Sequence, residues 1–295
     1  MGGAIFNHNG WLLVTNSTLV QNKAQGGTGG AGNSEGTGNA QAAGDGGSGF
    51  GGSIFNLNGV VTICSSTFAS NVVVAGAGGL SNPGVTNGFA GGADGGALYT
   101  LALSQTASVT LINSILANSS GGKDLASRGS VLTATEPNIV RSFTNSGGGF
   151  TTTGVVAVDP LLGPLTNNGG FAYTMALLPG SPALDAGDSA NAPVFDGRGL
   201  PRVSGAKVDL GAYELQVPTQ LLFTNWKFVS GGGLQLQFSG SSGTGYTIVS
   251  TTDLTLPLSN WTVLGSAIET TNGEFQFNDT QAMSFPQRSY RVRQP

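Results

Sequence analysis

Residues 2–22 read GGAIFNHNGWLLVTNSTLVQN, and this stretch decides the fold because the chain repeats it. It recurs at residues 51–71 as GGSIFNLNGVVTICSSTFASN, and more loosely at residues 95–119 as GGALYTLALSQTASVTLINSILANS. A motif that returns every few tens of residues is typical of one supersecondary unit stacked on copies of itself. The repeat therefore predicts a solenoid in which each copy forms one coil.

The repeat alternates apolar and polar positions with the period of a β-strand. Aligned without gaps, the copies share three apolar positions: Leu12/Val61/Val109, Val14/Ile63/Leu111 and Leu19/Phe68/Leu116. The position between the first two holds Leu13, Thr62 and Thr110 and is mostly polar. This period of two, rich in β-branched residues, predicts strands with one buried face and excludes helices. We expect a right-handed parallel β-helix.

Polar and glycine positions of the repeat predict its bends. Two adjacent positions are polar in every copy: Asn16/Ser65/Asn113 and Ser17/Ser66/Ser114. Such residues suit a corner, where the side chain bonds a backbone group of the turn or the same residue one coil away. The glycine pair that opens each copy suits a tight bend, where the backbone swings without a Cβ atom.

Two glycine-rich insertions, residues 23–50 and 72–94, separate the copies. They hold Gly, Ala, Asn, Ser and Thr with few large apolar residues. The chain has no continuous Gly-X-Y period, so it is not a collagen. Segments of this composition bury too little surface to offset their ordering entropy, so we expect loops that leave one corner of the coil. Passive decoration is the first interpretation, and a binding surface made of loops is the second.

The rest of the chain divides into three further parts. Coils continue irregularly to residue 158, with short strands at 130–134, 137–141 and 155–158 and a glycine-threonine loop at 143–153. Residues 159–215 carry six of the twelve prolines, which predicts a loop-rich cap over the C-terminal end of the solenoid, with a last strand at 208–214. A linker, 216–220, precedes residues 221–295, where short alternating stretches between turns predict a small antiparallel β-sandwich.

Charge and composition exclude several classes of partner. Charged residues make up 9% of the chain and the net charge is −4, so no basic face exists to meet nucleic acid. No apolar stretch is long enough to span a bilayer. Cys64 is the only cysteine, so it forms no internal disulfide, and His8, the only histidine, has no acidic neighbour to orient it. Met1 is followed at once by a full coil; we therefore expect that further coils and an export signal lie upstream of Met1.

Several phrases resemble known bacterial families. The set DPLLGPLTNNGG, LLPGSPALDAGD, DGRGLPR and VDLGAYE resembles the C-terminal part of β-helix proteins with a choice-of-anchor Q domain. GGAIFN, NSTLVQN and STFASN resemble the repeats of polymorphic outer-membrane proteins and pectate-lyase-like solenoids, and GYTIVSTTDL, NWTVLG and FPQRSYRV resemble a sandwich module of large secreted proteins. The resemblance implies a secreted or cell-surface protein, outside the cell.

Two groups of residues are candidate binding sites. Asp185, Asp188, Asp196 and Asp209 form an acidic constellation that could hold calcium, although Arg198 and Arg202 could instead pair with these carboxylates and lock the cap. Trp226 and Trp261 could form a platform for stacking sugar rings, although an alternating tryptophan in a sandwich is more often core. No other cofactor is expected.

The sequence favours a scaffold or adhesin over an enzyme. Lyases and hydrolases with this fold need carboxylates on neighbouring coils, and here Glu35, Asp45 and Asp94 lie in the insertions while Lys123, Asp124 and Arg128 lie on an irregular segment. We therefore expect no enzymatic activity and a binding role toward polysaccharide or cell-surface components. The alternatives are a polysaccharide lyase or glycoside hydrolase, and a segment that anchors or sorts the protein at the cell surface.

Overall fold

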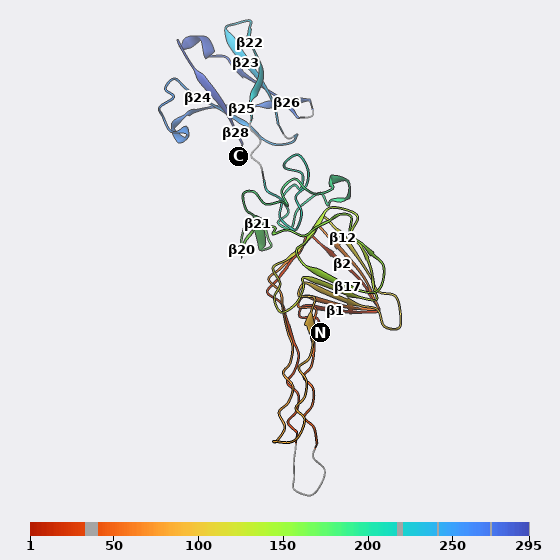
Figure 1. Cartoon of the computed structure of the whole chain (residues 1–295). Coiled ribbons are helices and arrows are strands. Elements are labelled where there is room, and N and C mark those ends of the chain that lie inside the picture. Colours follow the sequence, from red (N-terminus) through yellow and green to blue (C-terminus); the bar gives the residue numbers. More distant parts are fainter. Residues whose placement is uncertain (33–40, 217–220, 241, 272, 295) are drawn as a thin grey trace. The chain divides into compact units, whose positions relative to one another are not determined.

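The computed structural model describes residues 1–32, 41–216, 221–240, 242–271 and 273–294. The chain forms two compact units, Met1–Val217 and Pro218–Pro295. The first is a parallel β-helix with a lateral segment and the second is an antiparallel β-sandwich (Figure 1). Of the expected linker at 216–220, only residue 216 lies within the described residues. Glu35 lies outside them.

Three parallel sheets of five strands each form the β-helix, so the expected fold class is confirmed. The first sheet, A, contains β1 (Ile5–His8), β6 (Ile54–Leu57), β11 (Leu98–Leu101), β14 (Leu125–Arg128) and β17 (Phe143–Ser146). Sheet B contains β2 (Trp11–Thr15), β7 (Val60–Cys64), β12 (Ser108–Ile112), β15 (Val131–Thr133) and β18 (Phe150–Thr151). Sheet C contains β3 (Thr18–Val20), β8 (Thr67–Ala69), β13 (Ile115–Ala117), β16 (Asn138–Val140) and β19 (Val155–Val156).

The register between coils follows the aligned repeat. Leu12 lies beside Val61, which lies beside Val109, and the third copy keeps the register because Tyr99 lies beside Phe55. The apolar positions fill the interior, where most side chains of the second and third coils are fully buried. The stretch 143–153 was expected to be a loop, but it carries β17 and β18, whose aromatic residues Phe143 and Phe150 pack together at 5.2 Å.

The corner between sheets B and C is made by the polar positions of the repeat. Asn16, Ser65 and Asn113 have φ angles of 50°, 45° and 48°, in the left-handed region that asparagine tolerates better than most residues. The turn that each makes separates a strand of sheet B from a strand of sheet C. The predicted corners are therefore confirmed.

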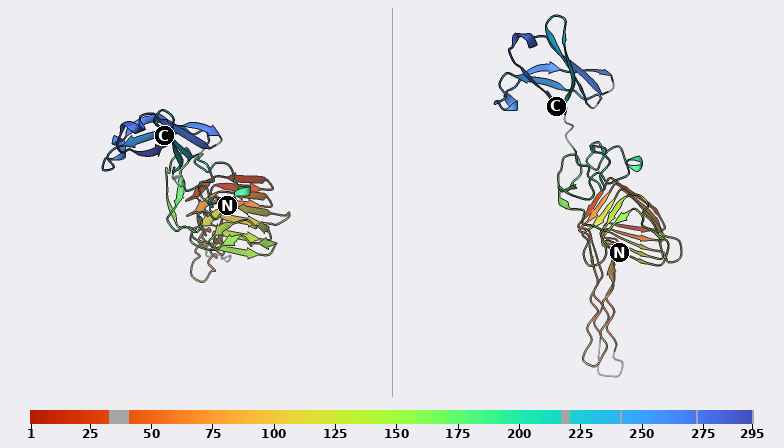
Figure 2. Two further views of the ribbon diagram at one scale, coloured as in Figure 1. Left: turned by 90° about the horizontal axis from the view of Figure 1, so that it is seen from above. Right: turned by 45° about the horizontal axis from the view of Figure 1, so that its top comes forward.

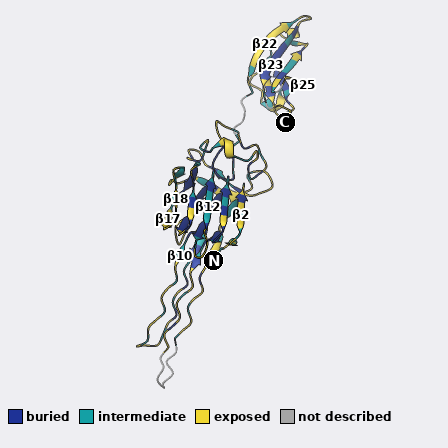
Figure 3. Ribbon diagram, turned by 90° about the vertical axis from the view of Figure 1, so that its right-hand side faces the viewer, coloured by how far each residue is buried: buried dark blue, intermediate teal, exposed yellow. Residues whose placement is uncertain are grey.

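The glycine-rich insertions form an ordered projection, which corrects the expectation of loops without structure. Four extended segments, residues 26–32, 41–49, 75–81 and 86–92, run side by side away from one corner of the coils (Figures 1 and 3). We call them the glycine stalk. Two short parallel pairs form its base: β4 (Lys23–Gln25) with β9 (Val72–Val74), and β5 (Gly49–Phe50) with β10 (Ala93–Asp94).

Residues 159–215, which we call the lateral segment, lie along the side of the coils. They contain the hairpin β20 (Leu162–Thr166) and β21 (Thr174–Leu177) and the short helix η1 (Ser189–Asn191). Leu177, Ala183 and Leu210 cover Ile115 and Ile139 on the outer face of sheet C. The predicted position over the C-terminal end is thus wrong, and residues 208–214 form no strand.

The sandwich packs two antiparallel sheets around one aromatic core. One sheet has the order β22 (Phe223–Val229), β23 (Gly233–Ser239), β27 (Glu274–Asp279) and β26 (Ile268–Thr271). The other has the order β25 (Thr262–Ser266), β24 (Thr247–Thr251) and β28 (Ser289–Arg293). The sandwich is the part coloured from cyan to dark blue in Figure 2. Phe238, Tyr246 and Phe275 meet between the two sheets with ring centroids 4.7–5.4 Å apart. The short helices η2 (Leu258–Asn260) and η3 (Ala282–Ser284) lie in connections.

No helix among the described residues has the length and apolar character that crossing a membrane requires.

Candidate functional site

The four candidate calcium ligands lie in the lateral segment, and most of their oxygens accept hydrogen bonds from nearby backbone. Asp185 and Asp209 are neighbours, because the Asp185 amide donates to Asp209 Oδ1 at 2.7 Å and the Leu215 amide donates to Asp209 Oδ2. Asp185 Oδ1 itself accepts from the Lys207 amide at 3.0 Å. A carboxylate that accepts hydrogen bonds from the amides of a loop stabilises the conformation of that loop.

Asp188 and Asp196 lie apart from that pair. Asp188 starts η1, where its carboxylate accepts from the Ala190 amide and from the Asn191 side chain. Asp196 is buried and forms an ion pair of 2.7 Å with Arg198. Within the described ranges, no three His, Cys, Asp or Glu side chains gather in a way that could hold a metal ion. The structure therefore brings together Asp185 and Asp209 but not the four carboxylates as one site.

Arg198 and Arg202 have different partners. Arg198 pairs with Asp196, donates to the Asn168 and Glu214 carbonyl oxygens, and lies 3.9 Å over the Tyr213 ring. Arg202 is fully buried, and it donates to Gly211 O at 3.0 Å and to Asn16 Oδ1 at 2.7 Å. Pairing of an arginine with a carboxylate thus holds for Arg198, whereas Arg202 joins the lateral segment to the first coil.

Glu214 is a buried carboxylate that the sequence analysis did not single out. It is 1% exposed, and its two oxygens accept from the Ser204 and Asp209 amides. Burial raises the pKa of Glu214 to about 7, and burial also raises the pKa of Asp209 beside it. The signal in the sequence was that two acids, Asp209 and Glu214, lie inside an otherwise largely apolar closing phrase, VDLGAYEL. The carboxylates of Glu214 and Asp209 thus have a structural role, because they accept hydrogen bonds from backbone amides of the lateral segment.

The glycine stalk is held by backbone hydrogen bonds that recur every third residue. Along one edge, the amides of Gly26, Gly29 and Gly32 donate to Val74, Ala77 and Leu80 at 2.9–3.0 Å. Other rows join the remaining neighbours: Gly44 to Gly30, Gly47 to Gly27, Gly76 to Gly47, Gly79 to Gly44, Gly46 to Phe89 and Gly91 to Gly76. A three-residue repeat is that of polyproline II helices, which make no internal hydrogen bonds and so donate to neighbouring chains.

Glycine is required inside the stalk because the segments touch through their backbones. A Cβ atom added at Gly29 would lie 1.9 Å from Gly44 O, and one at Gly76 would lie 2.0 Å from Gly27 O. Outward positions are free, since a Cβ at Gly27 or Gly30 meets nothing within 4 Å. Larger side chains point outward: Leu80 and Phe89 are each 74% exposed. The stalk thus presents side chains on a frame of hydrogen-bonded backbone segments.

The sandwich places one of the two candidate tryptophans on its surface. Trp226, on edge strand β22, is 63% exposed and meets the equally exposed Phe228 edge to face, with ring centroids 6.0 Å apart. Trp261 is half-buried, and its Nε1 atom donates to Leu256 O. Among the described residues, Trp226 makes no ring contact with Trp261, so Phe228 replaces it as partner. In the sequence, the spacing of two residues between Trp226 and Phe228 was the signal that could have predicted this pair on one face of a strand.

The remaining polar residues from the sequence analysis lie on the strands and turns of the coils. His8 is exposed on β1 and stacks against Phe6. Cys64 is half-buried, with its thiol beside the Asn191 carbonyl, and it lies next to Thr15 in sheet B. Asp124, expected on an irregular turn, is buried and bound by Ser119 and Ser142, and Arg128 ends strand β14.

In comparisons with known proteins, no family model and no curated protein sequence matches this chain.

Proposed function

We propose that this protein is a non-enzymatic β-helical scaffold with an adhesin-like binding role, secreted or held at the cell surface. The glycine stalk is the observation that carries the proposal. Ordering about thirty glycine-rich residues costs conformational entropy, which here is offset by rows of hydrogen bonds between segments. A hydrogen-bonded projection that displays Leu80 and Phe89 to solvent fits a surface that contacts an external partner better than it fits a passive insertion.

The location outside the cell rests on the resemblance to pectate-lyase-like, outer-membrane and choice-of-anchor Q proteins. The phrases that carry this resemblance, DPLLGPLTNNGG through VDLGAYE, make up most of the lateral segment, and the GGAIFN phrase opens the first coil. The single free cysteine is compatible with any compartment, so the proposal of export depends on the motifs alone.

Polysaccharide is the proposed ligand class for the sandwich. Trp226 and Phe228 present aromatic surface on an edge strand, and the apolar faces of sugar rings stack on such surfaces. Their register partners on β23, Leu236 and Leu234, lie toward the core, so the two rings extend the core face of the sheet into solvent.

A polysaccharide lyase is the second candidate, and one cluster on sheet A favours it. Tyr99, on β11, lies close to Arg128 of the next strand and to Asp94 at the base of the stalk. Burial raises the pKa of Tyr99 while Arg128 opposes that shift. A basic residue, a phenol and a carboxylate that lie together are the groups needed to abstract a proton from a sugar acid.

The test is binding and turnover of the full chain on a panel of neutral and acidic polysaccharides, with calcium and with a chelator. We expect retention on at least one polymer without new chain ends. Trp226→Ala and Phe228→Ala should each weaken that retention at least tenfold, whereas Ile268→Ala, an exposed apolar residue on the other edge of the same sheet, should not. Unsaturated ends that vanish in Arg128→Ala would establish the lyase instead.

A further inference from the structure

The outer face of one sandwich sheet carries a group of side-chain amides. On β23 and β27, Leu236, Phe238 and Phe275 point into the core, so the residues that alternate with them point outward. The same holds on β22 for Asn225, which is the register partner of Gln237. We call this surface the amide face, and its members are Asn225, Gln235, Gln237, Gln276 and Asn278.

The strand register places these amides in two rows across the sheet. Asn225, Gln237 and Gln276 lie side by side in one row, and Gln235 and Asn278 lie side by side in the next. Neighbours within a row are about 5 Å apart, which is the spacing of adjacent strands, and the rows are about 7 Å apart along the strands. The face therefore presents hydrogen-bonding groups at regular intervals.

Hydrogen bonds between the amides fix their side chains. Asn225 Nδ2 donates to Gln237 Oε1 at 3.1 Å, and Gln235 Nε2 donates to Asn278 Oδ1 at 3.0 Å. Within the described ranges, no acceptor of the chain reaches Gln237 Nε2 or Asn278 Nδ2, so both groups are free to donate to a ligand. Because these side chains are already held by their neighbours, a ligand loses little free energy in ordering them.

Gln235 contains a buried acceptor that lacks a donor. Its side chain is 8% exposed, and in the part of the chain that the structure describes no N–H or O–H group reaches its Oε1 atom. Turning the amide by 180° would leave Nε2 without an acceptor instead, so one polar atom of Gln235 is unpaired in either orientation. A buried polar atom without a partner destabilises the fold. A ligand that pairs with this atom therefore explains Gln235 better than the stability of the sandwich does.

The charge of the amide face favours a neutral ligand. The amides are uncharged, and the two charged residues that flank them have opposite signs: Lys227 lies beside Gln235, and Glu274 begins β27. An acidic polymer would meet one cation and one anion here, without net attraction. Hydroxyl groups both donate and accept hydrogen bonds, as side-chain amides do, so a neutral sugar polymer matches this face.

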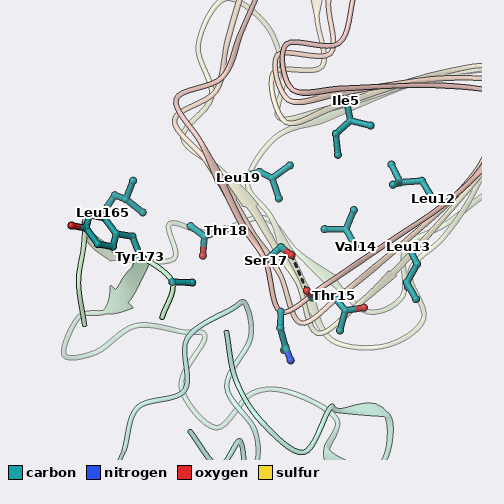
Figure 4. Close-up of a pocket in the computed structure, with 12 residues that line it drawn as sticks. Ile5, Leu12, Leu13, Val14, Thr15, Ser17, Thr18, Leu19, Leu165 and Tyr173 are labelled. Carbon is teal, nitrogen blue, oxygen red and sulfur yellow. Dashed lines mark hydrogen bonds between the residues drawn. The ribbon is translucent and has the colours of Figure 1, made fainter. Parts of the chain in front are cut away.

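A depression of about 920 Å³ in the first coil offers less to such a ligand. It is lined mostly by apolar side chains, and in Figure 4 those of Ile5, Leu12, Val14 and Leu19 point into the coil. Apolar walls supply no hydrogen-bond partners to hydroxyl groups, which lose their water when they enter. Of these two surfaces, the amide face is the better match.

We propose that the amide face binds a neutral polysaccharide, whose hydroxyl groups accept from Gln237 Nε2 and Asn278 Nδ2 and donate to Gln235 Oε1. This inference rests on the proposed polysaccharide-binding role of the sandwich and names a second contact surface for it. The exposed side chain of Lys227, the register neighbour of Gln235 on the edge strand, swings away when a hydroxyl group reaches the buried oxygen. The aromatic pair on β22 points to the opposite face of the sheet, so the two surfaces can be tested separately.

Affinity electrophoresis of the full chain tests the proposal. The probes are three neutral polymers, galactomannan, xyloglucan and soluble β-glucan, and one acidic polymer, polygalacturonate. We expect at least one neutral polymer to retard the chain more than polygalacturonate does. Gln235→Met and Gln237→Met should each weaken that binding about fivefold, the effect of one hydrogen bond. Gln281→Met, at an exposed amide outside the face, is the matched control and should leave binding unchanged.

Stability separates a binding role of Gln235 from a structural role. Methionine has a similar length and no strongly polar atom, so Gln235→Met removes the unpaired acceptor and should leave the sandwich at least as stable as before. Hydrogen exchange of β23 and β27 in the full chain under mild denaturant measures this. Weaker binding together with unchanged or slower exchange would mean that the variant has lost a ligand contact and kept its fold.

Three outcomes would overturn the inference. The first is binding of a neutral polymer that Trp226→Ala weakens but Gln235→Met and Gln237→Met leave unchanged; the polysaccharide role would then stand without the amide face. The second is faster exchange of β23 in Gln235→Met with unchanged binding, which would make Gln235 a structural residue. The third is retardation by polygalacturonate alone or by no polymer, and the latter result would also remove the proposed polysaccharide role.

Discussion

Oδ1 of Asn16, in the first coil, accepts a hydrogen bond of 2.7 Å from the buried guanidinium of Arg202, 186 residues later. The Nδ2 atom of the same side chain donates to Phe195 O at 2.8 Å. Both ends of one corner amide therefore hold the lateral segment against the coils. Asn113 does the same two coils further on, with the amide and carbonyl of Asp188.

Replacing Asn16 should loosen the lateral segment, and two substitutions separate the causes. Asn16→Gly keeps the left-handed φ of 50° but leaves a buried Arg202 donor unpaired, at a cost of about 1–3 kcal/mol. Asn16→Ala should cost about 1 kcal/mol more, because alanine is strained there. Hydrogen exchange at Gly211 and Ala212, whose amides bind the coils, measures the effect. Gln21→Gly, at another left-handed but exposed corner, is the control and should not speed exchange there.

The stalk predicts opposite outcomes for two adjacent glycines. Gly29→Ala places a methyl group 1.9 Å from Gly44 O, so the segments must separate and the hydrogen bonds around Gly29 and Gly44 should be lost. Gly30→Ala points into open space and should be tolerated. Amide exchange of Gly44, Gly47 and Gly79, measured by NMR, distinguishes the two. Equal protection in both variants would show that the stalk is not held by close backbone contact.

The buried carboxylate of Glu214 predicts that the β-helical unit loses stability as the pH rises. Its folded pKa, about 7, lies above the usual 4.5, so between these values the folded chain holds a proton that the unfolded chain has released. The free energy of unfolding should therefore be fully present below pH 4.5 and fall by roughly 2–3 kcal/mol toward pH 7. Asp209, whose pKa is also raised, acts in the same direction, and the neighbouring Arg202 opposes both.

Glu214→Gln should flatten most of this dependence because glutamine does not titrate. Denaturant midpoints between pH 4 and pH 8 measure it, with Glu274→Gln, an exposed residue of the sandwich, as the control. A slope that persists unchanged in Glu214→Gln would assign the pH dependence to other groups.

In the sandwich, Arg288 neutralises a buried carboxylate. Its Nη1 atom lies 2.8 Å from Asp279 Oδ2, both side chains are buried, and the Tyr290 hydroxyl donates to the same oxygen. Arg288→Met should destabilise the sandwich by about 3–5 kcal/mol because it leaves the charge of Asp279 unpaired. Arg291→Met, at an exposed arginine of β28, the strand that follows Arg288, should change stability by less than about 0.5 kcal/mol.

The phenol of Tyr290 gives a second readout of the same network. Burial and the hydrogen bond to Asp279 raise its pKa to about 12. Asp279→Asn removes the negative charge, so the pKa should fall toward 10. Ultraviolet titration of the phenolates in the native pH range of each variant detects the shift. A Tyr290 pKa that does not move would mean that burial alone sets it.

Much of the β-helix could be predicted because the repeat is local. The positions of Val61 and Val109 beside Leu12, and the left-handed corner at Asn113, follow from alternation and from the polar pair that ends each strand. Coils four and five were harder, because β18 and β19 have two residues each and carry almost no period. Their strands form because the preceding coil offers an edge.

The candidate site was less accessible to sequence analysis. Asp196 and Arg198 pair across two residues, which adjacency suggested, but Arg202 reaches Asn16 instead of a carboxylate. Phe228 lies beside Trp226 where Trp261 was expected, because Trp226 lies on β22 of one sheet whereas Trp261 precedes β25 of the other sheet. Such partners depend on how distant strands pack, and no local pattern encodes that.

The sequence by itself determined the coil: which side chains face inward, where it bends, and that copies stack in register. It could do so because alternation and corner residues act over a few neighbouring positions. Only the tertiary structure decided that the glycine-rich insertions are ordered, because their amides find acceptors only when four distant segments lie together. It also placed the lateral segment along the coils, where Ile115 and Ile139 of sheet C needed an apolar cover.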